Sequence, residues 1–543
     1  MDNRQDKTQF YKRYEKDRKK YIENVIESNS SKKIVAAGPG TGKTFLFQEI
    51  CNKKDNKNNL VLTFINELVR DLQKDLEKVA EVRTLHSFAK KILKSNFFME
   101  LTEIIEEDFL VIKNKKISFK KIFSNLEEGY NNKLNFYSKR RKYYAHFGPH
   151  CSIYTLLKIF DQKEKIPLYS QILIDEFQDF NKLEIRLIDL LSEKSPILLV
   201  GDDDQSLYKF KFANPNEIRE KHSSKEFERF ELPYSSRCPK VIVDSVNNIV
   251  DKARQSGFLK NRIEKNYKYF HSESKDKISN ENPQIIIEKQ IYETMLVSKI
   301  DREIQKIKQK DKNFSVLIIC TLYSQIARLE KRLRSSGYNN IQAPKVRQEM
   351  KKIEGYKLLL KEENSNLGWR IVSKYILDEK DFKEAINKSY SNAINFKDLI
   401  KDNKKQEIFE ILKILKKIQK SGTISVKEAE KVLKEFKYNP IEISLNKIKD
   451  SINNYIKPHE WYKNISIKIT TLLGSKGLTS DYIFLVCFDD RFILEKGHII
   501  TDENICKFIV ALTRARKKVY IYSAENKIPT FVSWLNKDFY NIT

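Results

Sequence analysis

The chain has 543 residues, of which 40% are hydrophobic, and it carries 102 Lys and Arg against 74 Asp and Glu, a formal net charge of +28. This length exceeds one ordinary hydrophobic core and predicts about three or four domains. The charge favours a polyanion such as nucleic acid as partner, although AT-rich codons would give part of the same Lys-rich composition.

The cysteines and the absence of apolar runs indicate the compartment. The six cysteines are Cys51, Cys151, Cys238, Cys320, Cys487 and Cys506. None forms a CxxC pair and no histidine stands beside them at metal-ligand spacing, which argues against zinc and iron–sulfur sites. The charged N-terminal stretch is no signal peptide, and no apolar run approaches the roughly 20 residues of a membrane span. We therefore expect a cytoplasmic protein that does not contact a membrane.

The first predicted strand leads into a glycine-rich loop. SKKIVAA (31–37) is followed by GPGTGKT and then by FLFQEICNKK, whose apolar residues have helical spacing. This order is typical of a phosphate-binding loop, in which backbone N–H groups and a helix N-terminus face a triphosphate. Lys43 would reach the β- and γ-phosphates, and Thr44 would hold Mg²⁺. The predicted loop contacts are Ala37, Gly38, Pro39, Gly40, Thr41, Gly42, Lys43 and Thr44. The alternative is a chance GKT turn.

A pair of carboxylates follows another buried strand. LYSQILIDEFQDF (168–180) places Asp175 and Glu176 directly after ILI. Asp175 would hold Mg²⁺, and Glu176 would orient or deprotonate the attacking water. As an alternative, the two residues could cap a helix. Together with the loop, they predict a nucleoside triphosphate hydrolase on a parallel α/β sheet.

The next strand, PILLVGDDDQSLYKF (196–210), completes a more specific pattern. Two strands that end in DEFQDF and VGDDDQSLY resemble superfamily 1 DNA helicases of the UvrD/Rep/PcrA type, and Ala37 matches the AGxGxGKT form of their loop. Further blocks that resemble this family follow in its order: VLTFINELVRDL (61–72), TLHSFAKKIL (84–93), ELPYSSRCPKVIVDSVN (231–247), ITTLLGSKGLTSDYIFLV (469–486) and FIVALTRARKKVYI (508–521).

The resemblance implies two RecA-like core domains with ATP between them. It assigns Arg237 and Arg514, both from the second domain, to the γ-phosphate, where they stabilise charge only when the cleft is closed. Gln205 would sense the γ-phosphate. The implied cofactors are ATP and Mg²⁺.

The resemblance also assigns nucleic-acid contacts. Phe64 is the expected base-stacking residue, and SLYKFKFA takes the place of the family's SIYGWRGA, so that Phe210 replaces its Trp. The full set of expected contacts is Thr63, Phe64, Asn66, His86, Tyr208, Phe210 and Lys211. For any single aromatic residue, a place in the core is the alternative.

Three positions differ from the family, and all three concern the base or the sugar of the nucleotide. Asp17 or Arg18 stands near the place of the adenine-reading Gln, Ser236 replaces the adenine-stacking Tyr, and Thr479 replaces a ribose-binding Glu. We therefore expect intact phosphate chemistry with ATP as the nucleotide, and the three positions leave the strictness for adenine open.

The expected fold is α/β, with two RecA-like parallel-sheet domains that are each interrupted by a mostly helical insert. The first core domain is 1–92 and 166–232, and the second is 233–345 and 460–543. The first insert, 93–165, contains KRRKYY, either a nucleic-acid surface or a solvated helix face. In the second insert, 346–459, we expect Asn366 and Arg370 to contact nucleic-acid backbone and Trp369 to lie in the core.

The leading hypothesis is an ATP-dependent helicase that moves 3′ to 5′ on single-stranded DNA and unwinds tailed duplex DNA, in repair, recombination or defence. A DNA-sensing ATPase subunit of a phage-defence or nuclease complex is one alternative, and an RNA-directed motor is another. We expect no fused nuclease, and a monomer or weak oligomer.

Overall fold

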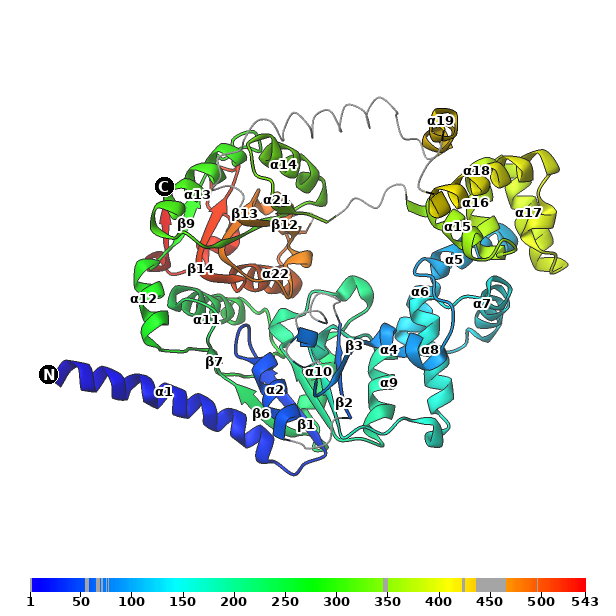
Figure 1. Ribbon diagram of the computed structural model, residues 1–543. Helices are drawn as coiled ribbons and strands as arrows, with labels where there is room; N and C mark the ends of the chain where they lie inside the picture. The colour runs from blue at the N-terminus through cyan, green and yellow to red at the C-terminus, as the bar shows by residue number, and fades with distance from the viewer. Residues whose placement is uncertain are drawn as a thin grey trace. The chain divides into compact units, whose positions relative to one another are not determined.

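The structure is a computed structural model that describes residues 2–53, 58–64, 69, 72–74, 76, 78–344, 350–421, 425–435, 465–495 and 497–543. The chain divides into two compact units (Figure 1). The core unit comprises Met1–Phe88, Leu157–Pro344 and Pro458–Thr543, and the accessory unit comprises Ala89–Leu156 and Lys345–Lys457. The accessory unit thus collects segments of both predicted inserts.

The first sheet of the core unit is parallel throughout and has the strand order β3-β2-β4-β5-β1-β6. Its strands are β1 (Lys32–Ala37), β2 (Asn59–Thr63), β3 (Glu81–Thr84), β4 (Gln171–Ile174), β5 (Ile197–Gly201) and β6 (Glu228–Leu232). The central strands are buried on both faces and therefore read as continuous apolar runs such as ILLV. Because all strands run the same way, the loops after β1, β4 and β5 meet at one edge of the sheet.

The second sheet has the order β11-β12-β10-β13-β14-β9-β15, again with parallel pairs. Its strands are β9 (Ile285–Glu288), β10 (Ser315–Cys320), β11 (Ile341–Gln342), β12 (Ser466–Thr471), β13 (Ser480–Val486), β14 (Ala515–Tyr522) and β15 (Tyr540–Ile542). A small parallel pair, β7 (Tyr234–Ser235) and β8 (Lys268–Tyr269), lies apart from both sheets. The two parallel sheets confirm the predicted RecA-like α/β fold.

Helices cover both faces of the second sheet: α13 and α14 on one side, α11 and α22 on the other (Figure 1). The longer helices of the core unit are α1 (Asp2–Glu27), α2 (Lys43–Lys53), α9 (Lys182–Ser192), α10 (Pro215–Ser223), α11 (Lys240–Gln255), α12 (Glu273–Glu281), α13 (Leu296–Lys310), α14 (Tyr323–Ser335) and α22 (Asp502–Leu512). Helices α4 (Leu85–Leu93) and α8 (Pro149–Phe160) each have residues in both units. Shorter elements are η1 (Lys163–Lys165), η2 (Phe177–Asp179), η3 (Asp203–Gln205), η4 (Lys209–Lys211), η7 (Leu473–Ser475), α21 (Asp490–Ile493), α23 (Thr530–Ser533) and η8 (Lys537–Phe539).

The accessory unit is helical in its described residues. Its helices are α5 (Leu101–Lys113), α6 (Phe119–Asn125), α7 (Asn131–Tyr144), α15 (Met350–Lys361), α16 (Asn366–Ile376), α17 (Glu379–Ser391), η5 (Phe396–Leu399), α18 (Asp402–Ser421) and α19 (Val426–Glu435). Side-chain caps define the starts of several of them: Ser365 accepts the N–H of Gly368 before α16, and Asp378 accepts that of Asp381 before α17. Trp369 is fully buried in the core of this unit, as predicted.

A buried ion cluster joins the two inserts and contains Arg140 of the first insert and Arg370 of the second. Asp108 accepts hydrogen bonds from Arg140 (Nη2, 2.6 Å), from Arg370 (Nη2, 3.0 Å) and from the hydroxyl of Tyr144 (2.6 Å), and all four side chains are buried. Arg370 therefore does not contact nucleic acid. In KRRKYY, Arg140 and Tyr144 are core residues. Burial of Arg140 is possible because Asp108, which is distant in sequence, compensates its charge.

Asn366 also has a structural role in place of the predicted nucleic-acid contact. Its Oδ1 accepts the N–H of Phe396 (2.8 Å), and its Nδ2 donates to the carbonyl of Tyr143 (3.3 Å). It therefore ties two segments of the accessory unit together.

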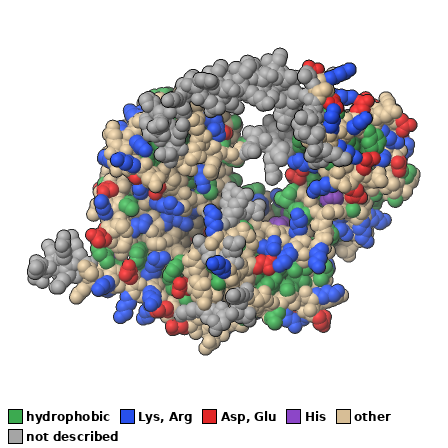
Figure 2. Space-filling model, in the orientation of Figure 1, with side chains coloured by type: hydrophobic (Ala, Val, Ile, Leu, Met, Phe, Trp, Pro, Cys, Tyr) green, Lys and Arg blue, Asp and Glu red, His purple; other side chains and the backbone are tan. Residues whose placement is uncertain are grey.

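The surface and the cysteines agree with the composition. Figure 2 shows Lys and Arg side chains spread over the visible face, with Asp and Glu among them. All six cysteines are buried free thiols. Among the described residues, no helix is long and apolar enough to cross a membrane.

Candidate active site

The glycine-rich loop lies between β1 and α2, at the edge of the first sheet. Gly40 and Gly42 have φ values of +71° and +97°, which favour glycine over other residues. A Cβ on Gly38 would come within 2.8 Å of the Tyr267 ring, and one on Gly42 within 2.9 Å of Nη2 of Arg18. The backbone conformation therefore favours glycine at positions 40 and 42, and close packing of a Cβ against Arg237 and Tyr267 favours it at positions 40 and 38, respectively.

The second core domain holds this loop through its backbone carbonyls. The carbonyl of Pro39 accepts hydrogen bonds from Ser235 Oγ (3.0 Å) and the Tyr267 hydroxyl (2.9 Å). The carbonyl of Gly40 accepts the N–H of Ser236 (3.0 Å). The sequence does not predict the roles of Ser235 and Tyr267. Both bind a backbone carbonyl, which every residue has, so the sequence of the loop does not indicate which side chains bind it.

The predicted carboxylates follow β4 and face the lysine of the loop. Lys43 Nζ donates to Glu176 Oε1 at 2.7 Å, and Gln178 Nε2 donates to Glu176 Oε2 at 2.7 Å. Glu176 has a φ of +51°, in the left-handed region that is unusual for a residue with a side chain. This backbone conformation, together with Gln178, fixes the direction of the carboxylate.

The two carboxylates are electrostatically different. Burial and the adjacent charge of Glu176 raise the pKa of Asp175 to about 6. Burial also acts to raise the pKa of Glu176, but the charges of Lys43 and Lys476 outweigh it and hold that pKa below its usual range. Glu176 is therefore ionised at neutral pH.

The two predicted arginines line the same cavity as Lys43 and both carboxylates. This cavity, of about 360 Å³, is lined by Pro39, Gly40, Thr41, Gly42, Lys43, Thr44, Asp175, Glu176, Gln205, Ser236, Arg237, Lys275, Gly477, Arg514 and Arg516. Arg514 Nη2 donates to Gln205 Oε1 at 3.2 Å. Burial and the nearby charge of Arg237 lower the pKa of Arg514 to about 10, so it remains a cation at neutral pH. Ala37 and Gly38 lie just before the lining residues, Ala37 at the end of β1.

Lys476 is a buried residue of this site to which we had assigned no role. Its Nζ donates to Asp179 Oδ1 (2.9 Å) and to the carbonyl of Gln205 (2.5 Å), and it lies 3.7 Å from Glu176 Oε2. The sequence feature that could have indicated this role is GSKGLTS, a part of one of the blocks that resemble the family. In it, a lysine stands among small residues after a predicted strand. Lys476 connects the carboxylates to the segment that contains Gln205.

The DDD run after β5 forms an anchor for a lysine. Lys265 Nζ lies 2.7 Å from Asp202, 2.7 Å from Asp203 and 2.9 Å from Asp204, and Arg262 adds a 2.6 Å contact to Asp204. The three carboxylates are close enough to share a metal ion, but an ammonium group already compensates them. The cluster therefore fixes the loop that carries Gln205.

Some of the expected nucleic-acid residues lie together, and others lie apart from them or are buried. Phe64, Tyr208 and Lys211 form a cluster: the first two rings are 4.9 Å apart, and Lys211 Nζ lies 4.5 Å from the Phe64 ring. Phe210, whose ring is 5.8 Å from that of Tyr208, is 53% exposed. Thr63 is buried at the end of β2. Asn66 lies outside the described residues.

His86 lies beside Glu184, with Nε2 3.7 Å from Oε1 of that residue. Burial and the charge of Lys211 lower the pKa of His86 to about 4, so the imidazole is neutral at neutral pH. A neutral ring can still donate one N–H to a phosphate.

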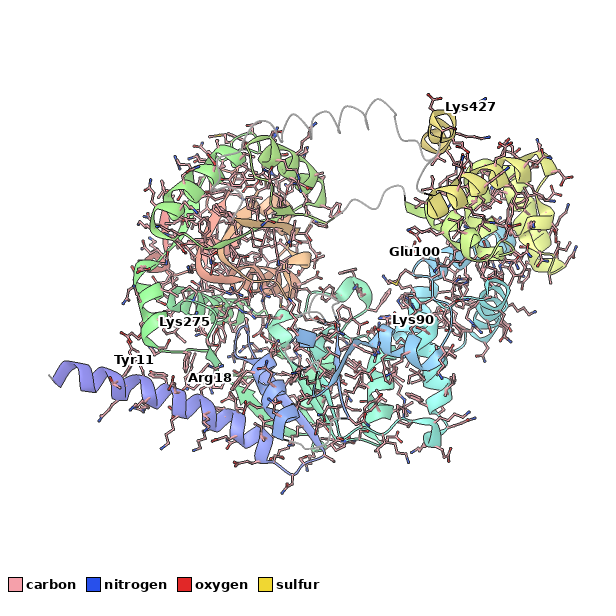
Figure 3. All side chains as sticks on the ribbon, in the orientation of Figure 1. Tyr11, Arg18, Lys90, Glu100, Lys275 and Lys427 are labelled. Atoms are coloured by element: carbon pink, nitrogen blue, oxygen red, sulfur yellow. The ribbon has the colours of Figure 1, made fainter. Side chains whose placement is uncertain are left out.

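Arg18, one of the two residues predicted near the place of the adenine-reading Gln, lies beside the glycine-rich loop. The guanidinium lies 5.7 Å from the Phe45 ring and 5.2 Å from the Phe270 ring. Figure 3 labels Arg18 on α1. Thr479, which replaces the ribose-binding Glu, accepts a hydrogen bond from Arg516 (2.9 Å). The glycine-rich loop is thus flanked by an arginine that contacts two aromatic rings.

Glu184 predicts a pH-dependent stability. Burial raises its pKa to about 7, although it accepts the N–H of Asn181 in the capping box of α9. Between about pH 4.5 and 7 the unfolded chain has lost this proton and the folded chain keeps it, so stability falls as pH rises. Relative to Glu184→Gln, the wild-type Tm should fall by about 4–8 °C from about pH 5 to pH 8. Thermal unfolding followed by circular dichroism measures this.

A matched substitution controls for the general effect of pH. Glu220 on α10 is exposed, and Glu220→Gln should leave the difference from wild type constant over the same range. An equal pH dependence in both variants would remove Glu184 as the cause.

Fold and cavity define a class of protein: two RecA-like domains, with a phosphate-binding loop on one and arginines from the other. The AAA domain family matches residues 22–211. The "ATP-dependent DNA helicase Rep" of Buchnera aphidicola subsp. Acyrthosiphon pisum is 25% identical, with 92% of this chain and 93% of that protein covered. The "ATP-dependent DNA helicase PcrA" of Staphylococcus aureus strain MRSA252 is 24% identical, with 93% and 83% covered.

A shorter match agrees with these two. "DNA helicase II" of Haemophilus influenzae is 32% identical over 104 residues, which are 18% of this chain and 14% of that protein. The comparisons agree with the type predicted from the ordered blocks: the chain is similar over most of its length to DNA helicases named Rep and PcrA.

Proposed function

We propose that the protein is an ATP-dependent motor that moves 3′ to 5′ on single-stranded DNA and unwinds tailed duplexes. The observation that carries this proposal is the cavity in which Arg237 and Arg514 of the second core domain join Lys43 and Glu176 of the first. Cations from across a cleft stabilise the transition state of phosphoryl transfer only while the two domains are closed. ATP hydrolysis is then coupled to the closing and opening of the two domains, and a translocase requires this coupling.

The residues of the first domain suit binding of ATP with Mg²⁺. Lys43 would exchange its partner Glu176 for the β- and γ-phosphates, which frees the carboxylate to orient or deprotonate water. The Thr44 hydroxyl and the Asp175 carboxylate are oxygen ligands of the kind that Mg²⁺ prefers. The ion would neutralise developing charge on the phosphates, and its presence would lower the raised pKa of Asp175.

Short contacts connect this cavity to the aromatic cluster. Arg514 binds the side chain of Gln205, and Lys476 binds the carbonyl of Gln205 and lies 5.7 Å from the Tyr208 ring. Tyr208 in turn contacts Phe64. A movement of Arg514 at the γ-phosphate could therefore reach Tyr208 and Phe64, which are suited to stack on bases, through these contacts.

A groove of about 1150 Å³ in the core unit offers a path for the strand. Its walls include Lys74 and Arg83 of the first domain, where Arg83 pairs with Glu81 of the same wall, and Lys468, Thr470 and Gly474 of the second domain. Cationic and small polar walls on both core domains are suited to a phosphodiester backbone.

The decisive experiment measures ATPase stimulation by single-stranded DNA and by RNA, and strand displacement on duplexes with a 3′ or a 5′ tail. The proposal expects stimulation by DNA and displacement only from 3′ tails. Displacement only from 5′ tails contradicts the direction, and stronger stimulation by RNA favours the RNA-directed motor. DNA stimulation without displacement favours the DNA-sensing subunit of a defence or nuclease complex, with a partner needed for unwinding. A cytoplasmic monomer or weak oligomer belongs to the same proposal, and light scattering measures its mass.

Phe210 is the exposed aromatic residue whose loss should weaken strand binding. We expect Phe210→Ala to reduce affinity for single-stranded DNA about 5- to 100-fold, since base stacking contributes about 1–3 kcal/mol, and to leave DNA-independent ATPase unchanged. Fluorescence anisotropy with a labelled oligonucleotide measures the affinity. Tyr292→Ala, which removes an aromatic ring that is 56% exposed elsewhere, is the control. Equal affinities of both variants would place Phe210 outside the strand path.

A further inference from the structure

The accessory unit contains a pocket of about 470 Å³ whose walls come from both inserts. One wall is the start of α5 with the residues before it, and the other is formed by α15 and α16. Phe98, Ile104 and Ile371 supply a buried apolar floor. A volume of this size accommodates a few side chains of a ligand.

Large apolar side chains at this pocket are exposed. Met99 is 55% exposed and Tyr375 is 46% exposed, and both line the pocket. A single exposed apolar residue is ordinary, but two that line one pocket with an apolar floor form the kind of surface found at interaction sites. Methionine in particular adapts its shape to different partners.

The pocket is acidic although the chain is strongly basic. Four glutamates line it against two cations, and one of the glutamates, Glu107, pairs with both of these cations, Arg370 (3.0 Å) and Lys374 (2.8 Å). The others are Glu100, labelled in Figure 3, Glu103 and Glu354, which pairs with Lys357 along α15. Excess carboxylate repels phosphodiester chains, so the charge of +28 that suits the chain to DNA does not extend to this pocket.

The pocket walls are fixed in advance by the buried ion cluster. Arg370 of α16 lines the pocket and binds Asp108 of α5, which also binds Arg140 of α7. The walls therefore keep their spacing without a ligand, and a rigid site loses little conformational entropy on binding.

We propose that this pocket is a docking site for a partner protein, whose binding segment inserts an apolar side chain flanked by lysine or arginine. The apolar floor and exposed Met99 and Tyr375 match the apolar side chain, and Glu100, Glu103 and Glu354 match the flanking cations. The proposal does not depend on the polarity or the substrate of the motor.

The test uses the full chain and a fluorescein-labelled peptide with a central Leu–Phe pair between Lys and Arg residues. We expect saturable binding to wild type and a loss of about tenfold or more in Glu100→Lys/Glu103→Lys/Glu354→Lys. The matched control is Glu379→Lys/Glu384→Lys/Glu410→Lys, which changes the charge equally at helix positions that are 82%, 51% and 60% exposed in the same unit. It should bind the peptide as wild type does.

Further measurements separate the pocket from its alternatives. Met99→Ser/Tyr375→Ser should also weaken binding, and it decides the question if the triple lysine variant does not fold. DNA-stimulated ATPase and circular dichroism should be unchanged in the serine variant. The proposal is overturned by no saturable binding, by equal loss in the control, or by unchanged affinity in the serine variant. Self-association of wild type that the pocket variants abolish would assign the pocket to a second copy of the chain and also overturn it.

Discussion

Glu176→Gln is expected to lower the kcat of ATP hydrolysis by about 10²–10⁴-fold, the range associated with loss of a general base. The carboxylate is buried, held by Lys43 at 2.7 Å and by Gln178 at 2.7 Å, and its pKa lies below its usual range. Glutamine preserves the shape and the contact with Gln178 but cannot take a proton. Steady-state ATPase assays with saturating single-stranded DNA measure the effect.

The same variant should bind nucleotide at least as tightly as wild type. Loss of the negative charge removes the competitor of the phosphates for Lys43, whereas Lys43→Ala should abolish turnover and weaken nucleotide binding. Glu226→Gln, at a side chain that is 68% exposed on the first domain, controls for the substitution itself. Hydrolysis by Glu176→Gln at the wild-type rate would contradict the assignment of the site.

The second large effect is expected in the accessory unit. Asp108→Ala should lower the free energy of unfolding of this unit by about 3–5 kcal/mol, because it leaves buried Arg140 and Arg370 without their shared carboxylate. Hydrogen exchange of the amides of α5, α7 and α16 measures the loss locally. Chemical unfolding followed by the fluorescence of buried Trp369, in a chain whose other two tryptophans are replaced by phenylalanine, provides a second measurement.

The pH dependence of this cluster has a defined sign. Burial acts to raise the pKa of Asp108, but the charges of Arg370 and Arg140 outweigh it, and the pKa is lowered from 3.8. The cluster therefore contributes its full stability above about pH 4 and loses it as pH falls through the lowered pKa. Asp402→Ala, at a side chain that is 91% exposed, should change stability by less than about 1 kcal/mol. An equally small effect of Asp108→Ala would show that the cluster is not what holds the inserts together.

The parts of the site that could be predicted from sequence are those whose chemistry is written in adjacent residues. Gly40, Gly42 and Lys43 stand in one loop, and Asp175 and Glu176 directly follow an apolar strand. The arginines were accessible only through the resemblance, since nothing local distinguishes Arg514 from the many other arginines and lysines of the chain.

The interactions that sequence reasoning missed join residues far apart along the chain. Lys476 and Asp179 are separated by 297 positions, and Arg370 and Asp108 by 262. A charged residue on an amphipathic helix ordinarily faces water. The sequence therefore predicts Arg370 as a surface cation, because its partner Asp108 belongs to the other insert. The rest of the fold was predictable because parallel sheets leave long apolar runs in sequence.

The buried thiols make this protein well suited to site-specific labelling. Nucleophilic attack requires the thiolate and access to it, and burial raises the pKa of Cys151, Cys506 and Cys487, the last to about 11. Maleimide dyes should therefore react slowly with the native chain and rapidly with a cysteine introduced on its surface. One such pair, with a dye on each core domain, would report the opening and closing of the cleft as a change in energy transfer, with no native cysteine to remove beforehand.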